Sequence, residues 1–534
     1  MIEVNTHQRH ESTSRVPHNS GRSTVGRAVA EIDAQGLAGS STAPAVSERD
    51  GLGASAPCPR APRAGLAGFA ALNAVAAWAG AVGLATGGID FGERTNDRLP
   101  FDSLVLAGVA LAVIVAVPLT VLAWLAWTGA ARTNDAALIA GLLIIGWIVA
   151  QVVALWAFSL FQPAYLGIGA LLIAASGRAR LGTRSRGILL LAAGTVGVAV
   201  GVGLVPHLAK NGATVMSLVS VLVLVVGIAL VVNGARSALR NRHRLTQVAG
   251  GAATAIVVAV AVLVIAPAVA ATNVPNTHVG LTPAALGLDY ERVTLTTTDG
   301  VDLAAWYLHG TNRAGVVILH GAGSTRSDVL DQAAALVHSG YAVVMIDARG
   351  HGDSGGTAMD FGWYGDLDIA AGTKFLASLA DIDRNRIGVV GFSMGGEEAI
   401  GAAATDPLIR AVVAEGATGR QAADKAWLSD TYGWRGWLQE RLENLQDGIT
   451  DYLTNASPPI SLRQAVNHAA DIQFLLITAG DVNDEGRAAS FIQSDTTERV
   501  TVWNVDGADH TGGYATRPDE WQQRVVEFLD ESLN

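Results

Sequence analysis

The residues best suited to chemistry in this chain form the pentapeptide Gly391-Phe392-Ser393-Met394-Gly395. An apolar run, Ile387 to Val390, precedes it and has the composition of a buried strand. If a helix follows, the glycines allow a sharp turn that lifts the serine hydroxyl out of the backbone, where it can act as a nucleophile. Because a chain with 61 glycines can produce such a pentapeptide by chance, the serine needs partners elsewhere in the sequence.

The elements around this serine alternate between strand and helix patterns. Asp299-Gly300 is a turn dipeptide that predicts an antiparallel hairpin at the start of the region. Helical patterns separate most of the later strands, which predicts an α/β fold with a mostly parallel sheet and chemistry at the carboxyl ends of its strands, where Ser393 falls. The expected strands are Val293 to Thr297, Leu303 to Leu308, Val316 to Leu319, Ala342 to Ile346, Ile387 to Val390, Ala411 to Ala414, Phe474 to Ile477 and Val500 to Trp503.

Three further stretches accompany the pentapeptide in a recognisable order. They are His320-Gly321-Ala322-Gly323 after one expected strand, the D-x-R-G-x-G-x-S stretch from Asp347 to Ser354 after the next, and Gly507-Ala508-Asp509-His510 before the last helix. With these motifs, residues 290–534 resemble the α/β-hydrolase superfamily, specifically bacterial serine hydrolases of the dienelactone hydrolase and serine-peptidase-like type. The resemblance implies an α/β-hydrolase fold that works without a metal ion or an organic cofactor.

The resemblance also implies a role for individual residues. Ser393 is expected to be the nucleophile, with His510 taking its proton and later returning it to the leaving group. Backbone N–H groups of Met394 and of Gly321 or Ala322 are expected to bind the oxyanion, at ~3 kcal/mol of transition-state stabilisation per donor.

The acid that would complete a catalytic triad is expected on the loop after the strand Phe474 to Ile477. That loop offers Asp481, Asp484 and Glu485. The family's usual form places an aspartate a few residues past a glycine at the strand end, and the acids here follow Gly480 at imperfect offsets. Asp484 is the preferred candidate, with Glu485 and Asp481 as alternatives, because a carboxylate of either type can orient the imidazole.

The alternating pattern breaks in an insertion at about residues 417–469. Its helical character predicts a cap over the active site, with aromatic side chains that mostly pack on the core and otherwise line a pocket. Such a pocket suits an apolar or medium-sized acyl, ester or peptide group. The aromatic residues concerned are Trp427, Tyr432, Trp434, Trp437 and Tyr452, and Trp363 and Tyr364 are expected to face the same site.

The composition indicates a membrane protein, because 50% of the residues are hydrophobic and only 16% are charged. Residues 64–271 contain apolar runs close to the ~20 residues that cross a bilayer. We expect an all-α transmembrane domain of about seven helices, preceded by a disordered tail over residues 1–63 and followed by a linker over 272–289. The expected spans are Leu66 to Thr86, Leu104 to Trp127, Ala137 to Ala157, Phe158 to Ser176, Ile188 to Val205, Val215 to Val232 and Val248 to Ala270, with a tight hairpin near Gln162-Pro163.

Arginine-rich loops predict the orientation, because positive residues in short loops stay cytoplasmic. One cluster lies between residues 178 and 186 and another between 236 and 244. Two spans separate the clusters, so both can be cytoplasmic, and one span follows the second. The chain is therefore predicted to be a multi-pass cell-membrane protein with a cytoplasmic N-terminus and an extracytoplasmic catalytic domain.

Several function classes fit the sequence poorly. A net charge of −11 argues against nucleic-acid binding, and the single cysteine, Cys58, has no second cysteine to pair with. No Asp, Glu, Lys or Arg lies mid-span as an ion path would need. Two functions remain: a membrane-anchored serine hydrolase that cleaves ester, thioester or amide bonds through an acyl-enzyme, or a membrane sensor or scaffold whose hydrolase-like domain binds ligand without turnover. The expected partners are a small-molecule ester, acyl or peptide substrate and the lipid bilayer, and the oligomeric state is left open.

Overall fold

The computed structural model describes residues 63–89, 96, 98–99, 103–159, 161–177, 182–494 and 496–533. The predicted tail up to residue 62, and Arg178 and Arg180 of the first arginine cluster, lie outside the described residues. All the elements below belong to one compact unit, Pro59–Asn534.

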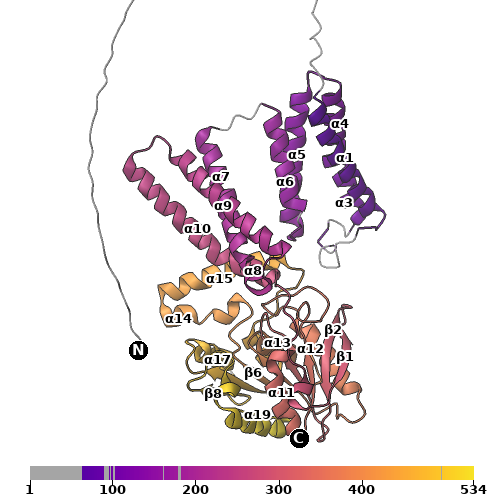
Figure 1. Cartoon of the computed structure of the whole chain (residues 1–534), viewed down its shortest axis with the longest axis vertical. Helices are drawn as coiled ribbons and strands as arrows, with labels where there is room; N and C mark the ends of the chain where they lie inside the picture. Colours follow the sequence, from indigo (N-terminus) through magenta and orange to yellow (C-terminus); the bar gives the residue numbers. More distant parts are fainter. Residues whose placement is uncertain are drawn as a thin grey trace, which may run out of the picture. The chain divides into compact units, whose positions relative to one another are not determined.

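The N-terminal half of the described chain is helical (Figure 1). Six of its helical segments are long and apolar enough to cross a membrane, whereas α6 has only 15 residues. Leucine, valine and tryptophan side chains are exposed along these helices, as expected for surfaces that face lipid. The elements are α1 (Ala64–Ala85), α3 (Leu104–Leu111), η2 (Ala112–Ala116), α4 (Val117–Trp127), α5 (Thr133–Leu155), α6 (Phe161–Ala175), α7 (Thr183–Gly203), α8 (Val205–Asn211), α9 (Val215–Leu239) and α10 (Arg244–Thr272).

Small residues bring the apolar helices close together. A Cβ atom added to Gly194 of α7 would lie 2.8 Å from the carbonyl oxygen of Gly227 on α9. On α5, a Cβ atom at Gly141 would lie 2.7 Å from the carbonyl oxygen of Gly169 on α6. Larger side chains at these positions would push the helix backbones apart, which is the packing logic of membrane helices.

Helix α6 has to return the chain across the bundle. The C-terminal domain touches the residues just after α5, through Phe158, and the end of α8, through Lys210. The ends of α5 and α7 therefore lie on the same side, which requires the chain to cross back between them. At about 1.5 Å per residue, α6 spans only about 22 Å, so it is a short helix for this task.

The C-terminal half is built on one eight-stranded sheet with the order β1-β2-β4-β3-β5-β6-β7-β8 (Figure 1). β2 pairs antiparallel with both β1 and β4, and the remaining neighbours pair in parallel. Each strand overlaps a strand expected from the sequence. The strands are β1 (Glu291–Thr296), β2 (Asp302–Leu308), β3 (Gly315–Leu319), β4 (Ala342–Ile346), β5 (Ile387–Phe392), β6 (Ile409–Glu415), β7 (Gln473–Ala479) and β8 (Val500–Val505).

Helices cover both faces of this sheet and give it two hydrophobic layers. One layer is formed with α11 (Leu330–His338) and α19 (Pro518–Ser532). The other is formed with α12 (Gly365–Ser378), α13 (Met394–Ala403), α16 (Leu462–His468) and α17 (Glu485–Gln493). Burial on both faces explains why the parallel strands appear in the sequence as continuous apolar runs.

The insertion between β6 and β7 is helical, as the sequence predicts. It contains η5 (Ala422–Lys425), α14 (Leu428–Tyr432) and α15 (Trp434–Leu453). The last helix of the predicted cap, α16, instead packs in the sheet's hydrophobic layer. Only the part from η5 to α15 therefore departs from the regular strand-helix pattern.

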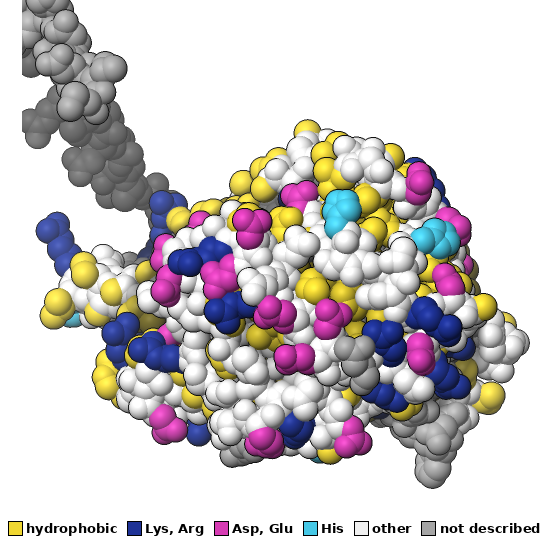
Figure 2. All heavy atoms as spheres, turned by 90° about the horizontal axis from the view of Figure 1, so that it is seen from below, with side chains coloured by type: hydrophobic (Ala, Val, Ile, Leu, Met, Phe, Trp, Pro, Cys, Tyr) yellow, Lys and Arg dark blue, Asp and Glu magenta, His cyan; other side chains and the backbone are white. Residues whose placement is uncertain are grey.

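Charged side chains of both signs share the face of the molecule drawn in Figure 2. Acidic and basic groups are interspersed there without a broad field of one sign. This mixture is typical of an ordinary solvent-facing surface.

Candidate active site

Ser393 stands at a strained turn between β5 and α13. Its backbone has φ 52° and ψ −118°, a conformation that side-chain-bearing residues rarely adopt. The flanking glycines make the turn possible, because a Cβ atom at Gly391 would lie 2.0 Å from the carbonyl oxygen of Gly395. The Ser393 N–H donates to the carbonyl oxygen of Glu415 at 2.7 Å, which ties the turn to β6. The strand-turn-helix context expected for this motif is therefore present.

His510 contacts the Ser393 hydroxyl from the loop after β8. Its Nε2 atom lies 2.8 Å from Ser393 Oγ. At the opposite ring nitrogen, Nδ1 lies 2.5 Å from Oε1 of Glu485. When Nδ1 carries the proton, Nε2 is the free acceptor that a serine hydroxyl needs.

The carboxylate that contacts His510 belongs to Glu485 and not to the preferred candidate, Asp484. Glu485 is the first residue of α17 and is buried, with Oε2 accepting the N–H of Ala479 at 2.8 Å. Asp484 has a left-handed backbone (φ 79°), and its carboxylate accepts from Tyr432 and Arg487 at 2.5 and 2.7 Å. The structure thus turns the two neighbouring acids toward different partners.

The remaining alternative, Asp481, is exposed, and its own N–H donates to the carbonyl oxygen of Ala508 at 3.1 Å. This bond joins the acid loop to the histidine loop through the backbone. Asp481 therefore contributes to the site's framework through its main chain.

The hydrogen bond with Glu485 raises the pKa of His510 above 6.5, and the charge of Glu485 adds to this effect while partial burial opposes it. A carboxylate beside an imidazole favours the charged ring, because the ion pair stabilises the imidazolium. The arrangement therefore stabilises the protonated histidine that forms when a serine gives up its proton.

Glu415 supports the histidine loop and was not found by sequence reasoning. Its buried carboxylate accepts from Trp521 Nε1 at 2.9 Å and from the N–H of Gly513 at 2.7 Å. Burial raises the pKa of this carboxyl. The only sequence signal is an acid at the end of an apolar strand beside the nucleophile strand, which is too common to single it out.

The loop from His320 to Gly323 borders the serine, as expected for an oxyanion loop. A Cβ atom at Gly321 would lie 3.3 Å from Ser393 Cβ and 3.9 Å from Ser393 Oγ. On the other side, Met394 begins α13, so its N–H belongs to a helix N-terminus next to the hydroxyl. The candidate donors Gly321, Ala322 and Met394 therefore lie on two segments that flank Ser393.

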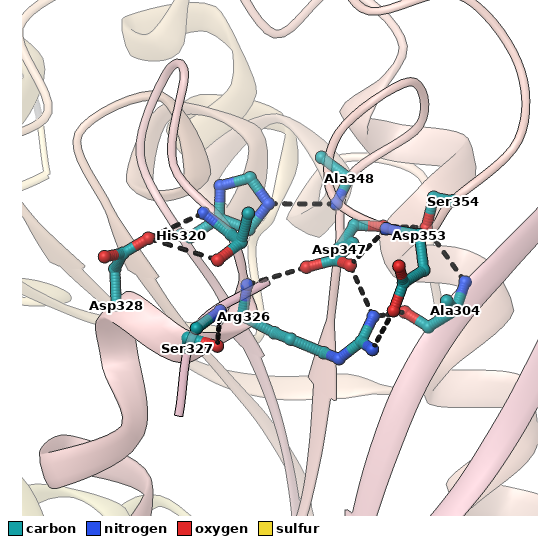
Figure 3. Close-up of polar contacts among 11 residues, drawn as sticks. Ala304, His320, Arg326, Ser327, Asp328, Asp347, Ala348, Asp353 and Ser354 are labelled. Carbon is teal, nitrogen blue, oxygen red and sulfur yellow. Dashed lines mark hydrogen bonds and ion pairs between the residues drawn. The ribbon is translucent and has the colours of Figure 1, made fainter. Parts of the chain in front are cut away.

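His320 holds this loop in place (Figure 3). The fully buried ring accepts the N–H of Ala348 at Nε2, at 3.1 Å, while Nδ1 lies 2.8 Å from the carbonyl oxygen of Gly321. Burial lowers the pKa of His320 to about 3. The ring therefore stays neutral and joins the loop to the segment after β4.

The D-x-R-G-x-G-x-S stretch has a structural role in the same region (Figure 3). Asp347 forms a buried ion pair with Arg326, whose second guanidinium nitrogen donates to Asp353 at 2.7 Å. The Ser354 hydroxyl donates to the carbonyl oxygen of Asp347 at 2.7 Å and accepts the N–H of Ala304 at 2.8 Å. These contacts fasten the loop after β4 to β2 and to the segment before α11.

The outer end of the loop from His320 to Gly323 is fastened to the apolar N-terminal helices and the segment that follows them. The carbonyl oxygen of Gly323 accepts from Lys210 Nζ at 2.8 Å and from Thr277 Oγ1 at 2.9 Å. The Gly323 N–H donates to Asp360 at 3.2 Å, and the N–H of Asp360 donates to the carbonyl oxygen of Ala271 near the end of α10 at 2.9 Å. The apolar half thus contacts the same loop that borders Ser393.

Two aromatic residues expected to face the site are used for packing. Trp363 is buried and donates to the carbonyl oxygen of Arg420 at 2.8 Å, and the ring of Tyr364 lies 4.3 Å from the guanidinium carbon of Arg349. In the insertion, Trp434 and Trp437 are exposed, so the expectation of core packing is wrong for them. Within the described ranges, no group of three or more His, Cys, Asp or Glu side chains could hold a metal ion.

A comparison with protein families matches residues 310–466 to the family described as Serine aminopeptidase, S33. The match covers the strands and loops that carry Ser393 and His320 and agrees with the mostly parallel sheet. The C-terminal domain has the α/β-hydrolase fold. The N-terminal helices lie outside this match, so the hydrolase domain follows a separate all-helical apolar region.

Similar proteins are found among curated proteins and solved structures. An uncharacterized protein of Mycobacterium tuberculosis (strain ATCC 25618 / H37Rv) is 32% identical over 118 residues, which is 22% of this chain and 41% of that protein. The chain thus spans less than half the length of this curated relative. An esterase of Pyrococcus furiosus is 26% identical, with 49% of this chain and 98% of that chain covered and a TM-score of 0.40. A dienelactone hydrolase from Anabaena variabilis is 19% identical, with 46% of this chain and 99% of that chain covered and a TM-score of 0.32.

Proposed function

We propose that this chain is a membrane-anchored serine hydrolase that cleaves ester, thioester or amide bonds through an acyl-enzyme intermediate. The observation that carries the proposal is the continuous set of hydrogen bonds from Glu485 through His510 to Ser393. A buried carboxylate, an imidazole and a hydroxyl in this order can activate the serine near neutral pH, where a free serine hydroxyl is a weak nucleophile.

In the first step, Ser393 Oγ attacks the carbonyl carbon of the substrate while Nε2 of His510 takes the hydroxyl proton. The Glu485 carboxylate holds the Nδ1–H group, so the imidazolium forms beside a negative charge. The same proton then goes to the leaving alcohol, thiol or amine, which departs and leaves an acyl group on Ser393.

In the second step, a water molecule attacks the acyl carbon and gives its proton to His510. The acid product leaves when that proton returns to Ser393 Oγ, which restores the starting state. In both steps, the negative charge on the carbonyl oxygen would be bound by the N–H of Met394 and by the N–H of Gly321 or Ala322. Donors already oriented by the protein stabilise this charge without a cost of reorganisation.

The membrane region would place the hydrolase domain outside the cytoplasm. Arg236 lies in the last turns of α9, Arg240 and Arg242 lie in the turn to α10, and Arg244 begins α10, whereas the hydrolase domain follows the other end of α10. Since positive residues remain on the cytoplasmic side, the opposite end of α10 is extracytoplasmic. Protease added to intact cells should therefore digest the hydrolase domain, and its full protection would overturn this orientation.

Labelling with a fluorophosphonate probe tests the chemistry directly. The full-length protein in detergent should be labelled, Ser393→Ala should not, and Ser378→Ala, an exposed serine at the end of α12, should behave like the wild type. Absence of labelling in folded wild-type protein would reject the enzyme and leave a sensor or scaffold with a hydrolase-like domain.

A further inference from the structure

Helix α15 exposes a row of large apolar side chains along one face. Trp434, Trp437, Leu438 and Leu445 are 74, 52, 44 and 58% exposed. Their spacing of three, one and seven residues places them within one sector of a helix with 3.6 residues per turn. We call these four residues the outer face of α15. An aromatic and aliphatic row of this kind is costly to leave in water, so it indicates a contact surface.

The acidic face of the same helix points the other way, toward the hydrolase domain. Glu440 accepts the N–H of Ser429 at 2.7 Å, Glu443 accepts from Lys425 Nζ at 3.0 Å, and Asp447 accepts the N–H of Ala422 at 2.6 Å. A surface helix normally buries its apolar side and shows its charges to water. α15 does the reverse: its acids face the hydrolase domain, and the four apolar side chains of its outer face stay exposed.

The surroundings of α15 connect this outer face with the membrane helices. α15 packs against α10. At the end of α15, the Tyr452 hydroxyl donates to Gln162 Oε1 at 2.5 Å, and the Tyr452 carbonyl oxygen accepts the N–H of Phe158 at 2.9 Å. Tyr452 therefore contacts the turn between α5 and α6. The Tyr452 ring also lies 5.6 Å from Trp156 and 6.0 Å from Phe158. The helix therefore runs beside the ends of the apolar helices, where a bilayer surface would lie.

We propose that α15 lies in the interface of the bilayer that the N-terminal helices cross, with its outer face among the headgroups and upper acyl chains. Tryptophan prefers this depth because its ring is apolar and its N–H remains hydrogen-bonded. A helix with one apolar face and few internal breaks binds there with that face buried. Arg441, whose guanidinium carbon lies 5.5 Å from the Trp437 ring centre, is placed to reach lipid phosphates.

The bilayer fits this surface better than a second copy of the chain does. α15 packs against α10, whose apolar side chains Ile256, Val260 and Leu263 are also exposed, so one bilayer can cover both helices. The proposal does not depend on the chemistry of Ser393. Tyr432, just before α15, donates to Asp484 beside Glu485. Docking of α15 on the bilayer would therefore hold the insertion against the loop that carries these acids. This would give the membrane a second role besides anchoring the chain.

Site-directed fluorescence in liposomes tests the proposal. In full-length protein with Cys58→Ser, single cysteines are introduced by Trp437→Cys or Leu445→Cys and labelled with an environment-sensitive fluorophore. The matched control is Gln439→Cys, an exposed position on the polar side of the same helix. Each labelled protein is reconstituted into vesicles of phosphatidylcholine and phosphatidylglycerol. These vesicles contain a lipid with a spin label near the top of its acyl chain, which quenches a fluorophore at that depth.

We expect the labels at positions 437 and 445 to be quenched at least about twofold more strongly than the label at 439, because an interfacial helix buries only its apolar face, ~5–10 Å deep. Equal quenching at all three positions, or none at 437 and 445, would overturn the proposal. Strong energy transfer between labelled copies at high dilution in lipid, without quenching by the spin label, would also overturn it and assign the outer face to a second copy.

Discussion

Glu485 and His510 share a 2.5 Å contact between a carboxylate oxygen and Nδ1, whereas the adjacent Asp484 faces Tyr432 and Arg487. The two acids are consecutive in sequence, and yet the Glu485 side chain is 1% exposed and the Asp484 side chain 38%. The pair therefore offers a matched experiment in which the same chemical change is made at neighbouring positions with opposite expected outcomes.

Glu485→Gln should reduce kcat on the order of 10³- to 10⁴-fold, because an amide cannot stabilise the imidazolium and favours the wrong tautomer of His510. Asp484→Asn should change kcat by less than about threefold, since it alters an exposed contact worth little. Hydrolysis rates with an acyl ester, or the rate of fluorophosphonate labelling, measure both. A larger loss for Asp484→Asn than for Glu485→Gln would contradict the assignment.

The pH dependence of hydrolysis should report the raised pKa of His510. A protonated ring cannot accept the proton of Ser393, so kcat/KM should rise with pH through a midpoint above 6.5. Glu485→Gln removes the main cause of the raised pKa, so the residual activity of that variant should have its midpoint at lower pH. A pH series of ester hydrolysis checks this, with Asp484→Asn expected to keep the wild-type midpoint. An unchanged midpoint in Glu485→Gln would mean that another group controls the profile.

The sequence was sufficient for the sheet and for the sharp turn at Ser393 because both depend on local patterns. β3, β4 and β5 are buried on both faces and therefore appear as short apolar runs, and the turn at Ser393 needs Gly391 and Gly395. The identity of the acid that contacts His510 depends instead on the three-dimensional structure of the loop. Which acid turns inward is decided by where α17 begins and by the left-handed backbone of Asp484, and neither is readable from the loop's composition.

The insertion shows a second limit of sequence reasoning. Its aromatic residues predict packing or a pocket lining, but the acids Glu440, Glu443 and Asp447 take the inner face of α15 through hydrogen bonds to residues 422–429. The tryptophans are left outside as a consequence. A helical wheel reveals the two faces, but only the three-dimensional contacts tell which one points inward.

The buried ion pair between Arg326 and Asp347 predicts a large effect on stability. Their side chains are 4% and 0% exposed, so Arg326→Met leaves a buried carboxylate without its counter-charge. We expect a loss of about 3–5 kcal/mol from the free energy of unfolding of the hydrolase domain. Thermal unfolding of the full-length protein in detergent, followed by the signal of the hydrolase domain, measures the change.

Arg517→Met is the matched control for that variant. Arg517 is 47% exposed and lies 3.4 Å from Glu520, so its loss should cost no more than about 1 kcal/mol. If both variants unfold at the same temperature, the Arg326–Asp347 pair does not stabilise the fold. The double variant Arg326→Met/Asp347→Leu should recover part of the loss, because it no longer buries an unpaired charge.

Lys210 predicts a link between the membrane region and the rate of the chemical step. Its ammonium group and the Thr277 hydroxyl donate to the same carbonyl oxygen of Gly323, at the outer end of the loop that borders Ser393. Lys210→Met removes one of these two hydrogen bonds. A hydrogen bond of this kind contributes about 0.5–1.5 kcal/mol. If its loss raises the activation free energy by the same amount, through displacement of the oxyanion donors, kcat should fall roughly 2- to 10-fold.

A positioning role for Lys210 predicts a specific kinetic pattern. KM should stay nearly constant in Lys210→Met, because the residue contacts the loop and not the substrate, and Lys210→Arg should retain most of the rate by keeping a donor at the same carbonyl. Lys374→Met, at an exposed position on α12, should leave both constants unchanged. A rise in KM with constant kcat would instead place Lys210 in substrate binding. Wild-type constants in Lys210→Met would mean that the oxyanion loop holds its geometry without the membrane helices.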